Sequence, residues 1–312
     1  MIRARRLHRH LLWPLATVAV LAAAPAGAQF GTIGGIVGKA RSAQKIGEGL
    51  RSINEQEEIR IGGDLAAMLL GAAPLVDNPA QQRYVNALGR WLALHSERPN
   101  LPWKFGIVDS PDFNAFSTPG GYVLITRGLF ERMRNESELA GVLAHEIAHV
   151  ARKHHLKALQ KSLRDQSLNE MRSYFSVSTG NGLADRFAGA LLSAGKDLYI
   201  KGLDREDEYE ADRMGVVIAA RSGYSPYGLV GVLQTLTATT DEAGYGLHNR
   251  THPLPLDRLV RLDAAMGTRF DAMPGLVDDA PGFAPMRNPP PPGPAAGPAK
   301  AKPKPKPKRP RG

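Results

Sequence analysis

The sequence contains no cysteine among its 312 residues. Disulfide bonds, thiolate metal sites and a lipid-modified cysteine behind a signal peptide are therefore excluded. A metal site in this chain would have to use histidine and carboxylate ligands.

Acidic residues are absent from both ends of the chain, in residues 1–28 and 289–312. The lysines and arginines of these two ends together exceed the whole-chain net charge of +10, so the residues between them are close to neutral. The body of a nucleic-acid-binding protein is normally basic. We therefore expect no nucleic-acid partner.

Long hydrophobic runs are also missing. The apolar stretch Leu11–Ala24 is shorter than the roughly 20 residues that cross a bilayer, and no later run is longer and as apolar. It follows the basic stretch Met1–His10 and precedes Ala26-Gly27-Ala28, the order of a secretory signal. We expect cleavage after Ala28 and a periplasmic or secreted protein without a transmembrane span. An uncleaved membrane anchor is the alternative.

Composition divides the chain into four parts. Residues 1–28 are expected to be the signal peptide and residues 29–54 a glycine-rich leader. A folded domain is expected over 55–275, followed by a disordered tail over 276–312 that is rich in proline and lysine. The tail is either a solvated end or a segment that contacts an anionic envelope surface electrostatically.

Hydrophobic periodicity within the domain predicts an α+β fold that is mostly helical. Strands are expected over residues 103–108 and 122–126, paired as a hairpin or meander. Asn135 is typical of a helix N-cap, and its helix is expected to run to about Leu159. Further helices are expected over residues 79–94, 204–220, 226–240 and 255–266.

The run His145-Glu146-Ile147-Ala148-His149 predicts a metal site on the helix that Asn135 opens. Residues i and i+4 of an α-helix lie about 40° apart around its axis, so both histidines can hold one ion. Glu146 can then reach a water molecule at the metal and act as general base, which is the chemistry of the His-Glu-x-x-His motif in zinc peptidases. Two surface histidines on an ordinary helix are the alternative.

A catalytic zinc site needs a third protein ligand. His155 lies six residues after His149, but an unbroken helix would turn it about 240° away, so we reject it. Glu208 and Asp212 are again four residues apart on a predicted helix and can face the first one together. We expect Glu208 to be the third ligand and Asp212 to accept the outer N–H of a ligand histidine.

With these two elements together, the chain resembles the HtpX-like gluzincin metallopeptidases. This family includes the CAAX prenyl protease type 1, the Oma-type proteases, and the envelope proteases BepA, LoiP and YcaL. Four sequence segments carry the rest of the resemblance, which covers about residues 55–268: Asn114-Ala115-Phe116, Pro119-Gly120-Gly121-Tyr122, Thr126-Arg127-Gly128-Leu129, and Thr251-His252-Pro253 with Arg258.

The resemblance implies a zincin-type fold with a small sheet beside the metal helix. It implies one Zn²⁺ per chain on His145, His149 and Glu208, with Asp212 in a supporting role. His252 is implied near the metal, where it closes the open coordination position, donates a transition-state hydrogen bond or is purely structural. Arg258 is implied to lie near the site. The segment from Tyr122 to Thr126 is expected to offer a free strand edge to an extended substrate. Four residues are expected to bind the substrate: Asn114, Gly120, Gly121 and Tyr122.

Three features of the family are missing from this chain. No tetratricopeptide repeat, lipobox cysteine or membrane span is visible in the sequence. The chain is thus most similar to a secreted, non-lipidated envelope member. We expect a zinc endopeptidase that degrades misfolded or unassembled envelope proteins, with protein or peptide substrates. A chaperone-like protein with a self-inhibited or structural zinc site is the alternative.

Overall fold

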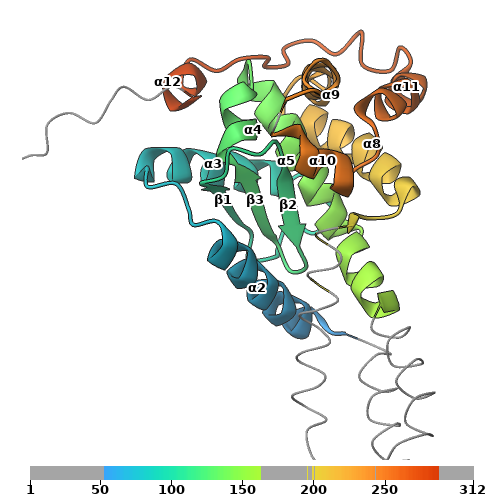
Figure 1. Cartoon of the computed structure of the whole chain (residues 1–312). Helices are drawn as coiled ribbons and strands as arrows, with labels where there is room; N and C mark the ends of the chain where they lie inside the picture. Colours follow the sequence, from blue (N-terminus) through green and yellow to red (C-terminus); the bar gives the residue numbers. More distant parts are fainter. Residues whose placement is uncertain (1–52, 163–194, 196–198, 200, 243, 288–312) are drawn as a thin grey trace, which may run out of the picture. The chain divides into compact units, whose positions relative to one another are not determined.

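The computed structural model describes residues 53–162, 195, 199, 201–242 and 244–287 (Figure 1). The expected signal peptide and leader, nearly all of residues 163–200, and the tail from residue 288 lie outside the described residues. No helix within the described ranges is long and apolar enough to cross a membrane.

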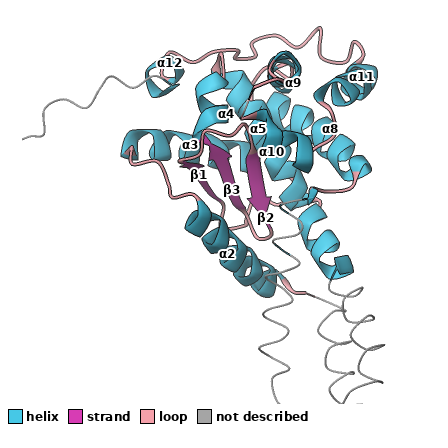
Figure 2. Cartoon of the chain, viewed as in Figure 1, coloured by secondary structure: helices cyan, strands magenta, loops and turns pink. Residues whose placement is uncertain are grey.

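The fold is built around helix α5 (Glu136–Ala151), every residue of which is buried. Asn135 caps this helix by accepting a hydrogen bond from the backbone N–H of Glu138 at 3.0 Å, as the sequence predicts. Helices α3 (Pro79–Ala93), α8 (Arg205–Arg221) and α9 (Gly228–Ala238) pack against α5. A small sheet lies beside it (Figure 2). The expected α+β, mostly helical fold is confirmed.

The sheet has three strands in the order β1 (Lys104–Val108), β3 (Tyr122–Thr126) and β2 (Ala115–Thr118). Strands β1 and β3 pair in parallel, whereas β2 and β3 form the antiparallel hairpin. The expected hairpin between 103–108 and 122–126 is therefore wrong. The four-residue strand β2 was missed because it is too short to show a period of two.

The position of β3 also corrects the expected substrate edge. Tyr122–Thr126 is hydrogen-bonded on both sides, by β1 and by β2, so it offers no free edge to a peptide. The strand beside α5 with a free side within the sheet is β2. The order of strands depends on tertiary pairing, which the sequence pattern of a single strand does not contain.

The turn between β2 and β3 packs against helix α2 (Glu55–Ala72). Gly120 and Gly121 there have positive φ angles of 79° and 103°. A Cβ atom on Gly120 would lie 2.5 Å from the Cα of Ile59, so only glycine fits this close approach. The backbone N–H of Gly120 also donates to the Glu58 carboxylate at 3.2 Å. These contacts explain both glycines structurally, and their role in substrate binding stays a prediction.

Helix α5 ends eight residues before the expected end near Leu159. Arg152 and Lys153 form a turn, and a new helical segment begins at His154 and continues to residue 162. Lys153 adopts a φ of 60°, in the left-handed region that is unfavourable for a lysine. Neither glycine nor proline marks this break, so the sequence predicts a continuous helix where the fold imposes a turn.

The domain also extends beyond the expected boundary at residue 275. Helix α12 (Phe283–Arg287) places the buried ring of Phe283 against Tyr84 and Phe130, with ring centroids 6.3 and 6.0 Å apart. The backbone N–H of Ser137 donates to the carbonyl of Asp278 at 2.9 Å. Residues 276–287 therefore belong to the folded domain and not to a tail.

Three further helices complete the described fold. Helix α4 (Arg127–Arg132) follows β3 directly. Helix α10 (Tyr245–Thr251) leads into His252, and α11 (Pro255–Met266) packs on α8 and α9. The sequence patterns for α3, α8, α9 and α11 predict their positions to within a few residues. Helices α4 and α10 were missed because they span only six and seven residues.

Candidate metal centre

Helix α5 brings His145 and His149 together, as their spacing predicts. Both rings are buried, and their Nε2 atoms lie 3.0 Å apart. Glu146, on the same helix, is also buried and lines a pocket that His149 shares. The helix therefore presents two ring nitrogens to one point with a carboxylate beside them.

Helix α8 supplies the third side chain of this cluster. The carboxylate oxygens of Glu208 lie 3.7 Å from His145 Nε2 and 3.5 Å from His149 Nε2. Close packing of α8 on α5 makes this possible, because a Cβ atom on Gly215 would lie 3.0 Å from the backbone of His145. His145, His149 and Glu208 thus form a buried group of donor atoms that could hold a metal ion.

The outer nitrogen of His145 is held by Asp212. Nδ1 of His145 lies 3.0 Å from Asp212 Oδ1. Arg258 of α11 binds the same carboxylate through two nitrogens, with Nε 3.0 Å from Oδ2 and Nη2 2.6 Å from Oδ1. We call Asp212 and Arg258 the aspartate arm. Both side chains are almost fully buried, at 2% and 3% exposed.

The outer nitrogen of His149 is held by a residue that the sequence analysis missed. Nδ1 of His149 lies 3.0 Å from Nδ1 of His154, and Nε2 of His154 lies 3.3 Å from a Glu210 carboxylate oxygen. Arg152 in turn donates to Glu210 at 2.6 Å. We call His154, Glu210 and Arg152 the histidine arm. The sequence signal was weak, since only the break at Arg152 and Lys153 turns His154 toward His149.

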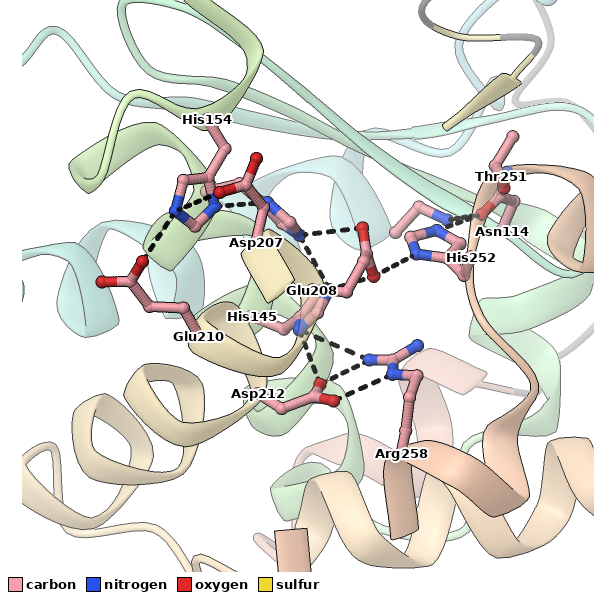
Figure 3. A network of polar contacts seen from close by, with 12 residues as sticks. Asn114, His145, His154, Asp207, Glu208, Glu210, Asp212, Thr251, His252 and Arg258 are labelled. Carbon is pink, nitrogen blue, oxygen red and sulfur yellow. Dashed lines mark hydrogen bonds and ion pairs between the residues drawn. The ribbon is translucent and has the colours of Figure 1, made fainter. Parts of the chain in front are cut away.

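His252 also reaches the cluster (Figure 3). Its Nδ1 lies 2.8 Å from a carboxylate oxygen of Glu208, and its Nε2 lies 3.2 Å from Oδ1 of Asn114. Asn114 is buried and donates through Nδ2 to Oγ1 of Thr251 at 3.2 Å. The structure therefore places His252 at the metal cluster. Asn114 reaches the cluster through His252, and it also contacts Thr251 of α10.

A pocket opens beside these side chains. It is lined by Glu146, His149, Glu208 and His252, together with Ala115 and Phe116 of β2. His155 lines it as well, and its ring centroid is 5.4 Å from that of His149. The reason for rejecting His155, an unbroken helix, was therefore wrong. The convergent group of donor atoms nevertheless contains Glu208 and not His155.

Burial and charge act in opposite directions on the carboxylates of the cluster. Burial alone would raise the pKa of Glu208, but His252, His145 and Arg258 outweigh it and lower the pKa to about 2. Burial would likewise raise the pKa of Asp212, yet Arg258 and His145 hold it well below its usual range. Both side chains are therefore carboxylates at neutral pH, the form that binds a cation.

The model of peptidase family M48 matches residues 79–266, which include every residue of the metal cluster and of both arms. The chain belongs to this family.

Relatives of this M48 chain carry protease names. The beta-barrel assembly-enhancing protease of Escherichia coli (strain K12) is 32% identical over 209 residues, which are 65% of this chain and 42% of the relative. The mitochondrial metalloendopeptidase OMA1 of Schizosaccharomyces pombe is 24% identical over 58% of this chain and 51% of its own. Metalloprotease YcaL of Escherichia coli (strain K12) is 29% identical over 47% of this chain and 56% of its own. The chain thus spans about half the length of these relatives.

The M48 assignment confirms the expected peptidase family, and two of these relatives are named metalloendopeptidase and metalloprotease. Metallopeptidases depend on a metal ion, and two histidines and one carboxylate are a donor set that suits a divalent transition metal. The residues of this chain therefore fit the ion that the family implies.

Proposed function

We propose that this chain is a zinc-dependent endopeptidase of the bacterial cell envelope that degrades misfolded or unassembled envelope proteins. The observation that carries the proposal is the convergence of His145, His149 and Glu208, with Glu146 in the pocket that His149 and Glu208 line. The name of one relative, the beta-barrel assembly-enhancing protease, supports an envelope role, and the signal-like N-terminus is consistent with it.

Zinc fits the donor atoms and their spacing. Ligand atoms bound tetrahedrally at about 2.0–2.1 Å from one zinc ion lie roughly 3.3 Å from one another. The Nε2 atoms of His145 and His149 lie 3.0 Å apart, and they lie 3.7 Å from Oε2 and 3.5 Å from Oε1 of Glu208, respectively. One zinc ion per chain, held by these three residues, would supply a Lewis acid that lowers the pKa of water and polarises the scissile carbonyl.

The residues of the chain divide the remaining work. We assign Glu146 as the general base that takes the proton of the attacking water and passes it to the leaving amine. Asp212 fixes His145 through its outer nitrogen, and Arg258 balances the buried charge of Asp212. Ala115 and Phe116 of β2 line the same pocket as Glu146, so an extended peptide would lie between β2 and α5.

The test replaces Glu146 and follows both cleavage and metal content. The Glu146→Gln variant should keep one zinc per chain and lose cleavage of an unfolded outer-membrane protein by at least about 100-fold. Glu131→Gln, a change of the same chemistry at an exposed position of α4, is the matched control and should cleave normally. Full activity of Glu146→Gln would rule out the assigned mechanism.

A second candidate function rests on the contact between His252 and Glu208. At 2.8 Å, His252 binds a carboxylate oxygen that is also expected to bind zinc. This contact favours a site that is closed at rest, in a protein that holds unfolded chains and cleaves them rarely. Under this alternative the chain acts as a chaperone-like binder.

The His252→Ala variant separates the two candidates. Faster substrate cleavage or self-cleavage than in the wild type would identify His252 as a closing residue of an active peptidase. Unchanged, very slow cleavage together with full suppression of substrate aggregation would favour the binder. Thr251→Val, at the neighbouring buried position, is the control for general damage to this segment.

A further inference from the structure

We propose that His154 is a positioning residue of the metal centre, which fixes the orientation and the tautomer of His149 through a hydrogen bond between their Nδ1 atoms. The inference deepens the proposed function, because it rests on His149 being a metal ligand. It concerns a side chain that makes no contact with the converging donor atoms themselves.

The positions of the ring protons determine which histidine donates in this hydrogen bond. His149 presents Nε2 to His145 and Glu208, so as a ligand it carries its lone pair there and its single proton on Nδ1. The partner of that N–H within hydrogen-bonding distance is Nδ1 of His154, at 3.0 Å. His154 must therefore accept at Nδ1, which places its own proton on Nε2.

The proton on Nε2 of His154 needs an acceptor, and the fold provides one. A carboxylate oxygen of Glu210 lies 3.3 Å from this nitrogen, and an ionised carboxylate can only accept. Glu210 is itself held by Arg152, whose second contact is Glu97 at 3.2 Å. Each N–H in the chain of hydrogen bonds from His149 through His154 to Glu210 thus meets an acceptor.

The surroundings of His154 make this a fixed contact. The side chain of His154 is fully buried, at 0% exposed, and it enters the site through the left-handed turn at Lys153. A strained backbone persists where surrounding contacts determine it, and such positions are common at functional sites. The turn has a clear structural effect here, since it redirects the chain so that His154 faces back toward His149.

The residues His154, Asp207 and Glu210 could also be read as a cation site of their own. Arg152 favours the positioning role, because it already neutralises Glu210 through a contact at 2.6 Å. Asp207 lies 3.7 Å from Nε2 of His154, beyond hydrogen-bonding distance, so it contributes little to the chain of hydrogen bonds.

The test measures zinc affinity of the full-length chain by competition with a chromogenic chelator, using zinc alone. Outer contacts of ligand histidines typically affect metal affinity by about 10–100-fold. We expect this loss in His154→Leu, which cannot accept a hydrogen bond. His154→Asn should recover affinity to within about threefold, because its amide oxygen can accept from His149. The visible spectrum of the cobalt-substituted protein should shift in His154→Leu and not in His154→Asn.

Variants of Glu210 and Asp207, the two carboxylates near Nε2 of His154, complete the design. Glu210→Met should weaken zinc binding by several-fold, whereas Asp207→Asn should leave it unchanged. Wild-type affinity and an unshifted cobalt spectrum in His154→Leu would overturn the proposal. So would a second bound zinc equivalent that disappears in both Glu210→Met and Asp207→Asn. A wild-type chain that binds no zinc would instead refute the metal centre itself.

Should His154→Leu fail to fold, His154→Ala, which also cannot accept a hydrogen bond, and Glu210→Met decide the matter. Folding is checked by circular dichroism of the metal-free variants. If both of these variants are folded and bind zinc as the wild type does, with the same cobalt spectrum, the contact does not position His149 and the proposal is wrong.

Discussion

The two histidines of α5 that converge with Glu208 are supported in different ways. Nδ1 of His145 meets the carboxylate of Asp212, and Nδ1 of His149 meets the imidazole of His154, both at 3.0 Å. The charges of the aspartate arm are buried, whereas the arginine and glutamate of the histidine arm are 40% and 31% exposed. Because the neutral ring of His154 separates His149 from Glu210, the charged pair of Glu210 and Arg152 can lie at the surface.

This difference has an energetic consequence. A buried carboxylate next to a ligand needs a buried counter-ion, and removing either partner leaves an uncompensated charge. A surface ion pair is screened by water and contributes little by itself. We therefore expect the aspartate arm to govern folding stability and the histidine arm to govern metal binding with little effect on folding. Four predictions test this contrast.

Breaking the aspartate arm should have the largest effect. Asp212→Ala leaves Arg258 buried and unpaired, and should lower the free energy of unfolding of the metal-free protein by about 3–5 kcal/mol. Urea denaturation in the presence of a chelator measures it. The double variant Asp212→Leu with Arg258→Met removes both charges and should recover much of the loss. A cost below about 1 kcal/mol for Asp212→Ala would mean that the pair is not desolvated.

Metal removal should distinguish the two arms next. At free zinc 100-fold above the dissociation constant, binding stabilises the folded state by about 2.7 kcal/mol, and a chelator removes this gain. In His154→Leu, with 10–100-fold weaker binding, the gain should shrink by about 1–2 kcal/mol. Comparing urea midpoints with zinc and with chelator measures the difference. Asp207→Asn serves as control, and an equal zinc gain in His154→Leu and wild type would contradict the contrast.

At Lys153, in the left-handed turn that leads to the histidine arm, glycine should be favoured over alanine, the reverse of their order within a helix. Lys153→Gly and Lys153→Ala both lose the ion pair with Glu58, so their difference isolates the backbone. Glycine should be more stable than alanine by about 1 kcal/mol, because the left-handed conformation at φ 60° costs alanine roughly that much. Thermal unfolding of the two variants measures it. Alanine being the more stable would show that α5 continues through this position.

The outer end of the histidine arm should show the smallest effect. Arg152→Ala removes partly exposed ion pairs with Glu210 and Glu97, so it should cost no more than about 1 kcal/mol of stability. Zinc affinity should fall by less than threefold. Chelator competition and urea denaturation check both values. A tenfold loss of zinc affinity would mean that the exposed ion pair, and not the buried ring of His154, holds the arm in place.

Much of the site is encoded in short sequence spacings. His145 with His149, and Glu208 with Asp212, are pairs at i and i+4, and a helix places such pairs on one side whatever surrounds it. Their helices are also recognisable from an N-cap and apolar periodicity, so α5 and α8 were predicted with the metal-binding residues on them. For this reason Glu208 lies beside both histidines, and its role as third ligand stays a prediction.

The pairing of strands and the turns between helices were predicted less well. The parallel pairing of β1 with β3 places Tyr122–Thr126 in the middle of the sheet, which no property of that segment reveals. The turn at Arg152 and Lys153 contains good helix formers, yet Lys153 adopts a φ of 60° there against their preference. His154 was therefore missed, although it stands only five residues from His149.

The sequence by itself determined the chemistry that we propose for the centre: two histidine ligands, one glutamate ligand and a neighbouring general base, because local helical geometry fixes residues four apart. The tertiary structure alone decided how each ligand is held. Arg258 reaches Asp212, His252 reaches Glu208, and His154 reaches His149 only because separate elements pack together. The physical reason is that hydrogen bonds between elements depend on how the whole core closes, whereas spacing within a helix depends on the backbone alone.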